Sequence, residues 1–324
     1  MALGRAESRF PAVYVLPGNY TMTQPAAKSK VVLVRSAAAL GADGKPNADA
    51  VASLLAAGVR QLTATQNAAV GLAELVRPAQ KVGLKVNCLG GRVAVTQPEL
   101  VLALAELLQK AGVNGGNIVV WDRSTDELKR AGYTANMFKS GPQCFGTDAR
   151  GVGYSADLYP IGSIGSLVSN ILLDVDLSIN LPVLKDHSLA GLAGGMKNYY
   201  GAIHNPNKYH DNHCNPHVAD VNSLPAICDR NRLTIMDCLN VQYHGGPAYN
   251  PGFLDRFGGL ILGIDPVAVD FVALSVLEKI RSAHGKPPLA REGRDPAWIQ
   301  TAASAKYALG HASWEKIEFI EKTV

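Results

Sequence analysis

The sequence predicts an α/β fold built around a parallel sheet of βαβ units. Short apolar segments such as 30–36 and 82–88 alternate with longer stretches in which Ala, Leu and Val recur at helical spacing. Strands and helices that alternate in this way are typical of parallel sheets. The chain has 324 residues, 47% of them hydrophobic, which is enough for one large or two ordinary domains. We therefore expect an α/β core arranged as two lobes with a cleft between them.

The individual elements follow this alternation. Strands are expected at 30–36, 82–88, 117–123, 173–184, 233–239, 258–264 and 316–320. Helices are expected at 47–77, 98–112, 124–133, 265–280 and 296–308. Pro98 suits a first helical turn, where Glu99 also complements the helix dipole, and Gly112 suits a helix end. Asp265 suits an N-cap position before Pro266.

The chain is expected to divide into three segments. Residues 1–29 form an N-terminal extension, 30–230 an α/β lobe with most of the histidines, and 231–324 a smaller α/β lobe. The N-terminus lacks the apolar core of a secretory signal. Two locations stay open, the cytoplasm or an exported mature protein, and the sequence does not indicate an oligomeric state.

Composition excludes several classes of partner and cofactor. The net charge is only +4 and no basic run occurs, so we expect no nucleic acid partner. No apolar stretch reaches about 18 uninterrupted residues, so we expect no membrane span. The five cysteines form no C-x-x-C pair, which argues against an iron–sulfur cluster. A small molecule is the expected substrate.

The histidines gather in one segment. Five of the eight fall within residues 186–217, around a glycine-rich stretch and a lysine. His187 and Lys197 are ten residues apart, which on a continuous helix would separate them by about 15 Å along the axis. The glycines between them permit a tight turn, so we expect both side chains to face one cavity. The alternative is a glycine-rich helix contact with Lys197 in solvent.

The same segment offers candidate metal ligands. Imidazole and thiolate suit zinc, nickel, copper and iron, and a divalent transition metal, nickel or zinc, is expected here. The candidate ligands are His213, His217, Cys214, His204 and His210. The i, i+4 pair His213 and His217 does not lie on one helix, because Asn215 and Pro216 suit an N-cap and a first helical residue. The alternative is a polar loop with solvated histidines.

Several segments together resemble one bacterial family. They are 85–91 (KVNCLGG), 96–112, 119–124 (VVWDRS), 181–187 (LPVLKDH), 194–201 (GGMKNYYG) and 263–270 (GIDPVAVD). The chain resembles the family grouped as domain of unknown function 362, over roughly residues 80–280. The family is largely uncharacterised, so the resemblance implies little about activity.

A more distant resemblance concerns the glycine-rich stretch. Residues 187–203 (HSLAGLAGGMKNYYGAI) resemble the motif of nickel-pincer lactate racemases, in which a His is followed by A-G-x-S-G-G-x-K and then P-G-I. The resemblance implies that His187 is a catalytic acid/base. It also implies that Lys197 covalently holds a nickel-pincer nucleotide, beside Gly194 and Gly195, and that His213 coordinates the metal.

The N-terminal half adds candidate substrate contacts. Residues 90–100 (GGRVAVTQPEL) resemble the D-x-T-R-P loop of the racemases, which makes Arg92 a candidate contact for a carboxylate or phosphate. The racemases carry a second catalytic His after the next strand, where this chain has WDRST. Asp122 is therefore the candidate second catalytic group, and Arg123 and Ser124 are candidate substrate contacts. A symmetrical two-histidine racemisation does not follow from these residues.

These observations predict a metal-dependent enzyme acting on a small polar organic molecule, by redox chemistry or by proton or hydride transfer. Two alternatives stay open. One is a protein that binds a metal or small ligand without turnover. The other is a metal-free enzyme that uses Lys197 and His187, in which burial near other cations lowers the pKa of the lysine.

Overall fold

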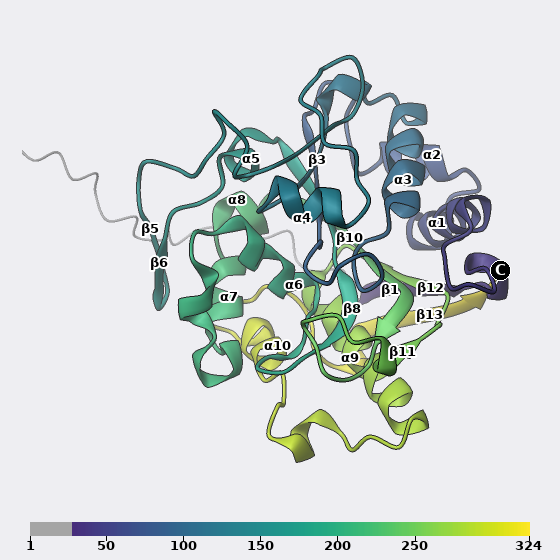
Figure 1. Cartoon of the computed structure of the whole chain (residues 1–324), viewed down its shortest axis with the longest axis vertical. Coiled ribbons are helices and arrows are strands. Elements are labelled where there is room, and N and C mark those ends of the chain that lie inside the picture. Colours follow the sequence, from purple (N-terminus) through teal and green to yellow (C-terminus); the bar gives the residue numbers. More distant parts are fainter. Residues whose placement is uncertain (1–27) are drawn as a thin grey trace, which may run out of the picture.

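A large mixed sheet with helices on both faces forms the protein (Figure 1). The computed structural model describes residues 28–324, so residues 1–27 of the predicted N-terminal extension lie outside the described residues. The strands are β1 Ser29–Arg35, β2 Val82–Val86, β3 Ile118–Asp122, β4 Gln143–Gly146, β5 Tyr159–Ile161, β6 Ile164–Ser166, β7 Leu177–Leu181, β8 Val183–His187, β9 Gly191–Leu192, β10 Asn231–Gln242, β11 Leu254–Asp255, β12 Gly259–Gly263 and β13 Ile317–Thr323. The helices are α1 Ala48–Thr63, α2 Ala68–Ala73, α3 Pro98–Lys110, α4 Thr125–Arg130, α5 Asn170–Asp174, α6 Gly195–Asn198, α7 His217–Asn222, α8 Pro225–Cys228, α9 Pro266–Ala283 and α10 Trp298–Ala303.

The sheet confirms the predicted α/β class. Its strand order is β13-β1-β12-β10-β7-β2-β3-β4. Strands β8 and β11 also pair with β10, and β9 pairs with β8. From β10 to β4 all neighbours are parallel, as the βαβ pattern predicts, whereas β12 runs antiparallel to both β10 and β1. This one sheet joins strands from both sides of residue 230, so two lobes are not confirmed and the boundary at 230/231 stays a prediction.

Alternating side chains along the strands pack into two separate hydrophobic cores, one on each face of the sheet. On β1, Val32 and Val34 pack with α1, α2 and α3, whereas Val31 and Leu33 pack on the opposite face with α9. This is the period of two that a strand imposes on its side chains. Figure 1 shows α1–α3 on one side of the sheet and α6, α7, α9 and α10 on the other. The sheet is therefore covered on both faces, as expected for parallel strands.

Most element boundaries agree with the capping signals. Asp265 accepts hydrogen bonds from the backbone N–H groups of Val267 and Ala268 and so caps α9, as predicted. The helix predicted over 47–77 is in fact two helices, because Ala64 is left-handed and Asn67 caps a new start. The predicted last helix, 296–308, is shorter.

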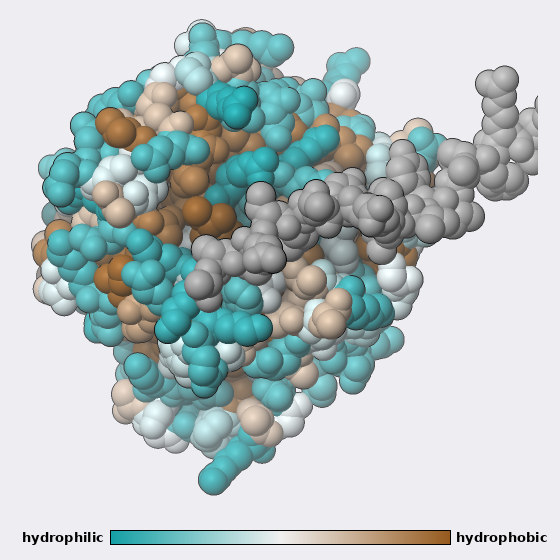
Figure 2. Space-filling view, turned by 180° about the vertical axis from the view of Figure 1, so that it is seen from behind, coloured by the Kyte–Doolittle hydropathy of each residue, from teal (hydrophilic) through white to brown (hydrophobic). Residues whose placement is uncertain are grey.

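Two further predictions of local structure need correction. The strand predicted over 173–184 splits into the end of α5, then β7 and β8. Helix α7 begins at His217 with Pro216 as its cap residue, one residue later than predicted. No helix within residues 28–324 is long and apolar enough to cross a membrane. Figure 2 shows the opposite face of the molecule, where hydrophilic residues cover much of the visible surface.

Candidate functional site

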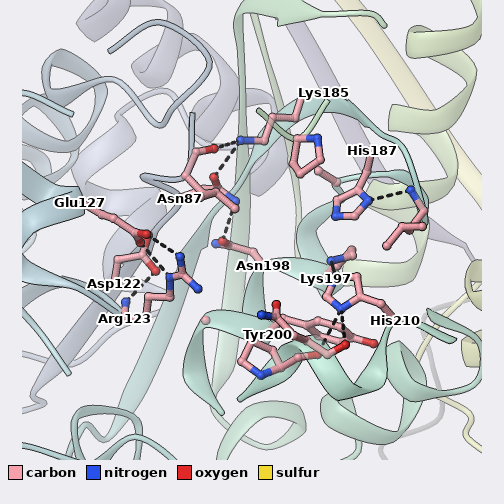
Figure 3. Close-up of a pocket in the computed structure, with 18 of the residues that line it drawn as sticks. Asn87, Asp122, Arg123, Glu127, Lys185, His187, Lys197, Asn198, Tyr200 and His210 are labelled. Atoms are coloured by element: carbon pink, nitrogen blue, oxygen red, sulfur yellow. Dashed lines mark hydrogen bonds and ion pairs between the residues drawn. The ribbon is translucent and has the colours of Figure 1, made fainter. Parts of the chain in front are cut away.

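A cavity of about 350 Å³ opens where the carboxyl ends of β2 and β3 meet β8 and α6 (Figure 3). In open α/β sheets, ligands bind at this edge of the strands. The charged and polar side chains that line it are Lys85, Asn87, Asp122, Arg123, Glu127, Lys185, His187, Ser188, Lys197, Asn198, Tyr200, Asn207 and His210. The site therefore draws on strands and loops that lie far apart along the chain, from Lys85 to Pro247.

The glycine-rich stretch brings His187 and Lys197 to the same cavity, as predicted. His187 ends β8, the chain turns back through β9 at Gly191, whose φ is +73°, and α6 then carries Lys197. A side chain at Gly194 would lie only 2.5 Å from the Asp270 carboxylate, so glycine is needed for this close packing. The alternative of Lys197 in solvent is wrong, because the residue is only 9% exposed.

Lys197 is a buried amine without a carboxylate partner. Its Nζ donates a hydrogen bond to His210 Nε2 at 3.1 Å and lies 4.4 Å from the centre of the Tyr200 ring. Among residues 28–324, no carboxylate lies within ion-pair distance of this amine. Burial lowers the pKa of Lys197 to about 8, because the charged form loses its hydration. At pH 7 roughly a tenth of this amine is therefore neutral, far more than for a lysine with the ordinary pKa.

His187 is held as a neutral imidazole with a fixed tautomer. Its Nδ1 accepts hydrogen bonds from the backbone N–H groups of Leu189 and Ala190, both at 3.2 Å. Because backbone N–H groups only donate, Nδ1 carries no proton and the ring proton is on Nε2. Burial, and then the charge of Lys197, lowers the pKa of His187 to about 2. Its second ring nitrogen is turned toward the cavity (Figure 3), where it offers an N–H donor.

His210 has the complementary tautomer. Its Nδ1 lies 3.1 Å from the Pro206 carbonyl and 3.3 Å from the Asn207 carbonyl, which only accept, so Nδ1 carries the proton. Its Nε2 is then free to accept from Lys197. Burial and the charge of Lys197 lower the pKa of His210, and the ring stacks on His187 with the ring centres 5.5 Å apart. The two imidazoles thus present one donor and one acceptor beside the amine.

Asp122, the predicted second catalytic group, ends β3 and lines the cavity. Its Oδ1 accepts from Lys85 Nζ and from the backbone N–H of Arg123, and its Oδ2 accepts from the backbone N–H of Cys88, all at 2.8 Å. Lys85 in turn donates to Asn198 on α6 at 3.3 Å. These contacts tie β2, β3 and α6 together around a buried ion pair. The catalytic role of Asp122 stays a prediction.

Lys185 is the second buried lysine without an ion pair. It is 1% exposed, and its Nζ donates to three oxygens: the Asn87 side chain at 3.2 Å, the Ala94 carbonyl at 3.1 Å and the Leu89 carbonyl. Burial lowers the pKa of Lys185 to about 8. All three donors of a protonated amine are therefore used to hold the loop that follows β2.

Only one of the three predicted substrate contacts reaches the cavity. Arg123 lines it, and its Nε and Nη2 donate to both oxygens of Glu127, which leaves Nη1 without a protein acceptor among the described residues. Arg92 is exposed and Ser124 is half-buried, and neither lines the cavity. Of the predicted cofactor contacts, Gly194 lines the cavity, whereas Gly195 donates its N–H to Asp270.

Two of the predicted metal ligands lie on the surface. His213 is exposed, and its Nδ1 lies 2.9 Å from the Leu189 carbonyl. His204 is exposed and packs edge-to-face against Tyr154. Neither residue lines the cavity that contains Lys197.

The other three candidate ligands do not form a common metal site. His217 Nδ1 lies 3.1 Å from Ser163 Oγ, Cys214 is buried, and His210 is paired with Lys197. Within residues 28–324, no three or more His, Cys, Asp or Glu side chains gather closely enough to hold one metal ion. His213 does not line the cavity that contains Lys197, and a nickel-pincer group held by these two residues stays a prediction.

The polar residues of the site that the sequence missed include Lys85, Asn87, Lys185 and Asn198. They lie in the short segments KVN, LKDH and KNYY, which were noted only for their family resemblance. A polar residue inside an otherwise apolar predicted strand was the available signal, because burial of a lysine there requires a specific set of acceptors.

The known proteins that are similar to this chain include the following two. One is the thylakoid-associated protein sll1697 of Synechocystis sp., 28% identical over 221 residues, which are 64% of this chain and 66% of that protein. The other is the structure of the lactate racemase apoprotein from Thermoanaerobacterium thermosaccharolyticum, with a TM-score of 0.38 and 16% identity. That match covers 65% of this chain and 50% of the racemase. This chain therefore spans about two thirds of the length of the Synechocystis protein and about half of the length of the racemase.

The family itself is identified by a match over most of the sheet and the whole cavity. Residues 82–275, from β2 to α9, match the family described as domain of unknown function (DUF362). This range includes every charged side chain that lines the cavity. The chain belongs to the DUF362 family.

Proposed function

We propose that the protein is an enzyme that forms an imine between Lys197 and a small carbonyl compound carrying an acidic group. The observation that carries this proposal is the Lys197 amine, which is buried at the cavity, lacks an ion pair and has a pKa lowered to about 8. A lysine that is desolvated near other cations is the usual form of an amine nucleophile.

The charge of the cavity favours an anionic substrate. Four cationic and two anionic side chains line it, and Asp122 and Glu127 are already paired with Lys85 and Arg123. The remaining positive charge, on Lys185 and Lys197, is buried. Coulomb interactions are stronger in a buried environment than at the surface. The free Nη1 of Arg123 is the donor best suited to a carboxylate, because a guanidinium pairs with it through directed hydrogen bonds.

The proposed step conserves atoms and electrons. The Lys197 lone pair forms a C–N bond with the carbonyl carbon while the C=O electron pair moves to oxygen. One proton passes from nitrogen to this oxygen and gives a carbinolamine. The second N–H proton then passes to the same oxygen, the C–O bond breaks, and water leaves as the nitrogen lone pair forms the C=N bond of the imine. His187 Nε2–H donates to the developing oxyanion, as a neutral imidazole can. His210 accepts one N–H of the amine and so orients the lone pair.

This proposal takes the metal-free alternative over the metal-dependent enzyme that the sequence favoured. Its support is the separation of the candidate ligands, with His213 outside the cavity, together with the pairing of His210 and Lys197 inside it. The alternative of binding without turnover predicts no covalent bond to Lys197, so trapping of the imine distinguishes the two.

Glyoxylate with borohydride tests the proposal, because this smallest aldehyde acid leaves a stable carboxymethyl group on any lysine that forms an imine. Labelling is located by mass spectrometry of peptides. At pH 8 a lysine amine with the ordinary pKa has on the order of a hundredfold less neutral form than Lys197. The reference for labelling is Lys129, which is exposed. We expect Lys197 to be labelled at least about tenfold faster.

The pH dependence gives the control. Labelling of Lys197 should rise about tenfold per pH unit below pH 8 and level off above it, since only the neutral amine reacts and its pKa is about 8. A lysine amine with the ordinary pKa continues to gain reactivity to about pH 10. Labelling of Lys197 no faster than Lys129 at pH 8 would overturn the proposal.

A further inference from the structure

Two exposed leucines stand on the lining of the cationic cavity. Leu89 follows β2 and is 44% exposed, and Leu189 lies between β8 and β9 and is 49% exposed. Both line the cavity, whereas Lys185 and Lys197 on the same lining are almost fully buried. The buried end of the cavity is therefore cationic, and its exposed lining includes these two leucines beside the polar residues Ser188 and Asn207.

The backbone of both leucines is held by residues of the site. The Leu189 N–H donates to His187 Nδ1, and its carbonyl lies 2.9 Å from His213 Nδ1. The Leu89 carbonyl accepts from Lys185 Nζ. Their exposure therefore does not come from loose loops. Single exposed leucines are common on protein surfaces, but two fixed ones on one cavity mouth form a local apolar surface.

The volume of the cavity leaves room beyond the reacting group. About 350 Å³ corresponds to roughly ten water molecules at about 30 Å³ each. A carboxylate and an adjacent carbonyl occupy only part of this space. A substrate that fills the rest extends past the leucines, where an aliphatic group loses contact with water.

We propose that Leu89 and Leu189 form an apolar subsite, and that the substrate is a carbonyl acid with an aliphatic chain of several carbons. This rests on the proposed function for the carbonyl, but the subsite itself requires only that the carboxylate binds at the cationic end. The chain lies across the two leucines, with the acidic group toward Arg123 and the amine of Lys197.

Calorimetric binding of butanoate, hexanoate and octanoate tests the subsite, since these acids cannot form an imine. Each methylene buried on the leucines should raise the affinity up to about fourfold. In the double variant Leu89→Ser/Leu189→Ser the three acids should bind with nearly equal affinity. Leu102→Ser is the matched control, because Leu102 is 64% exposed on α3 and does not line the cavity. It should keep the dependence on chain length.

The outcomes separate the two proposals. Equal affinities for the three acids in the unaltered protein, or an unchanged dependence in the double variant, would overturn the apolar subsite. Glyoxylate labelling of the unaltered protein decides the role of Lys197 independently, because glyoxylate has no chain to reach the leucines. A chain-length dependence that is lost only in the double variant supports the subsite whatever the labelling shows.

Discussion

Lys185 and Lys197 show how the same residue type takes two roles in one cavity. Both are buried, and burial lowers the pKa of each to about 8. Lys185 donates to three oxygens of the loop after β2, whereas Lys197 makes one side-chain hydrogen bond, to His210. The first arrangement satisfies the amine and stabilises the fold. The second leaves the amine able to react, at a cost in stability.

The two lysines should therefore respond oppositely to removal of the amine. We expect Lys185→Met to lower the free energy of unfolding by about 2 kcal/mol or more, since three oxygens lose their donor. Lys197→Met should raise the stability by about 1 kcal/mol, because it removes a buried charge with a single hydrogen bond. Thermal unfolding at pH 7 measures both. Equal destabilisation by the two variants would contradict the distinction.

The gain in stability expected for Lys197→Met depends on pH, and the burial of the Lys197 charge gives the direction of this dependence. The pKa of Lys197 is about 8 in the folded state and close to 10.5 when unfolded, so the unfolded state binds more protons between these values. The cost of burying the charge is full below pH 8 and disappears as the pH rises toward 10.5. The advantage of Lys197→Met should shrink over this window.

At the residue scale, spacing and glycine content were enough to place His187 and Lys197 together. The five candidate metal ligands could not be placed in the same way. Clustering in the sequence does not determine where the side chains point. Asn212, His213 and Cys214 adopt left-handed backbone angles that no local sequence motif predicts. These angles, with His213 held on the Leu189 carbonyl, leave its ring outside the cavity lining.

At the scale of elements, α6 depends on a cap supplied by another helix. It has only four residues and no side-chain cap of its own. Asp270 on α9 accepts from the backbone N–H groups of Gly195 at 2.5 Å and Met196 at 2.9 Å, one on each carboxylate oxygen. The position of Lys197 is therefore set by a residue 73 positions further along the chain.

Asp270→Asn should loosen α6 and slow the reaction at Lys197. The amide has one acceptor oxygen, and its NH2 faces a backbone N–H, so we expect a loss of about 1–3 kcal/mol in stability. Glyoxylate labelling of Lys197 should slow while that of Lys129 does not change. Asp176→Asn is the matched control, because exposed Asp176 accepts from one backbone N–H, of Lys81, through one oxygen. Unchanged labelling in Asp270→Asn would exclude the positioning role.

The elements themselves were mostly predictable because their signals are local. Asp265 and Pro266 placed the start of α9, and Pro98 placed the start of α3. The polar residues on β2 and β8 were not predicted to meet, since their pairing depends on strand order. That order comes from contacts between segments about 100 residues apart, such as Lys185 and Asn87.

At the scale of the whole molecule, one sheet crosses the predicted boundary at residue 230. Strand β10 pairs with β7, which precedes the boundary, and with β12, which follows it. Strand β1 then lies between β12 and β13, so the first and last described strands are neighbours. Neither predicted lobe has a complete sheet without the other.

We therefore expect residues 28–324 to unfold in a single transition. Differential scanning calorimetry should give one peak, with the calorimetric enthalpy close to the van't Hoff enthalpy. Two resolved transitions would instead support the predicted division into 30–230 and 231–324.

The chain segments that supply the cavity residues determine how the protein could be redesigned. The reacting amine and its two imidazoles come from β8, α6 and the turns after α6, whereas Leu89 comes from a loop pinned by Lys185. Leu189, by contrast, lies two residues after His187, so only Leu89 is encoded apart from the reacting groups. Exchange of the leucines alone offers a route to new acids while the amine keeps its surroundings, and a small library at two codons would be enough to explore it.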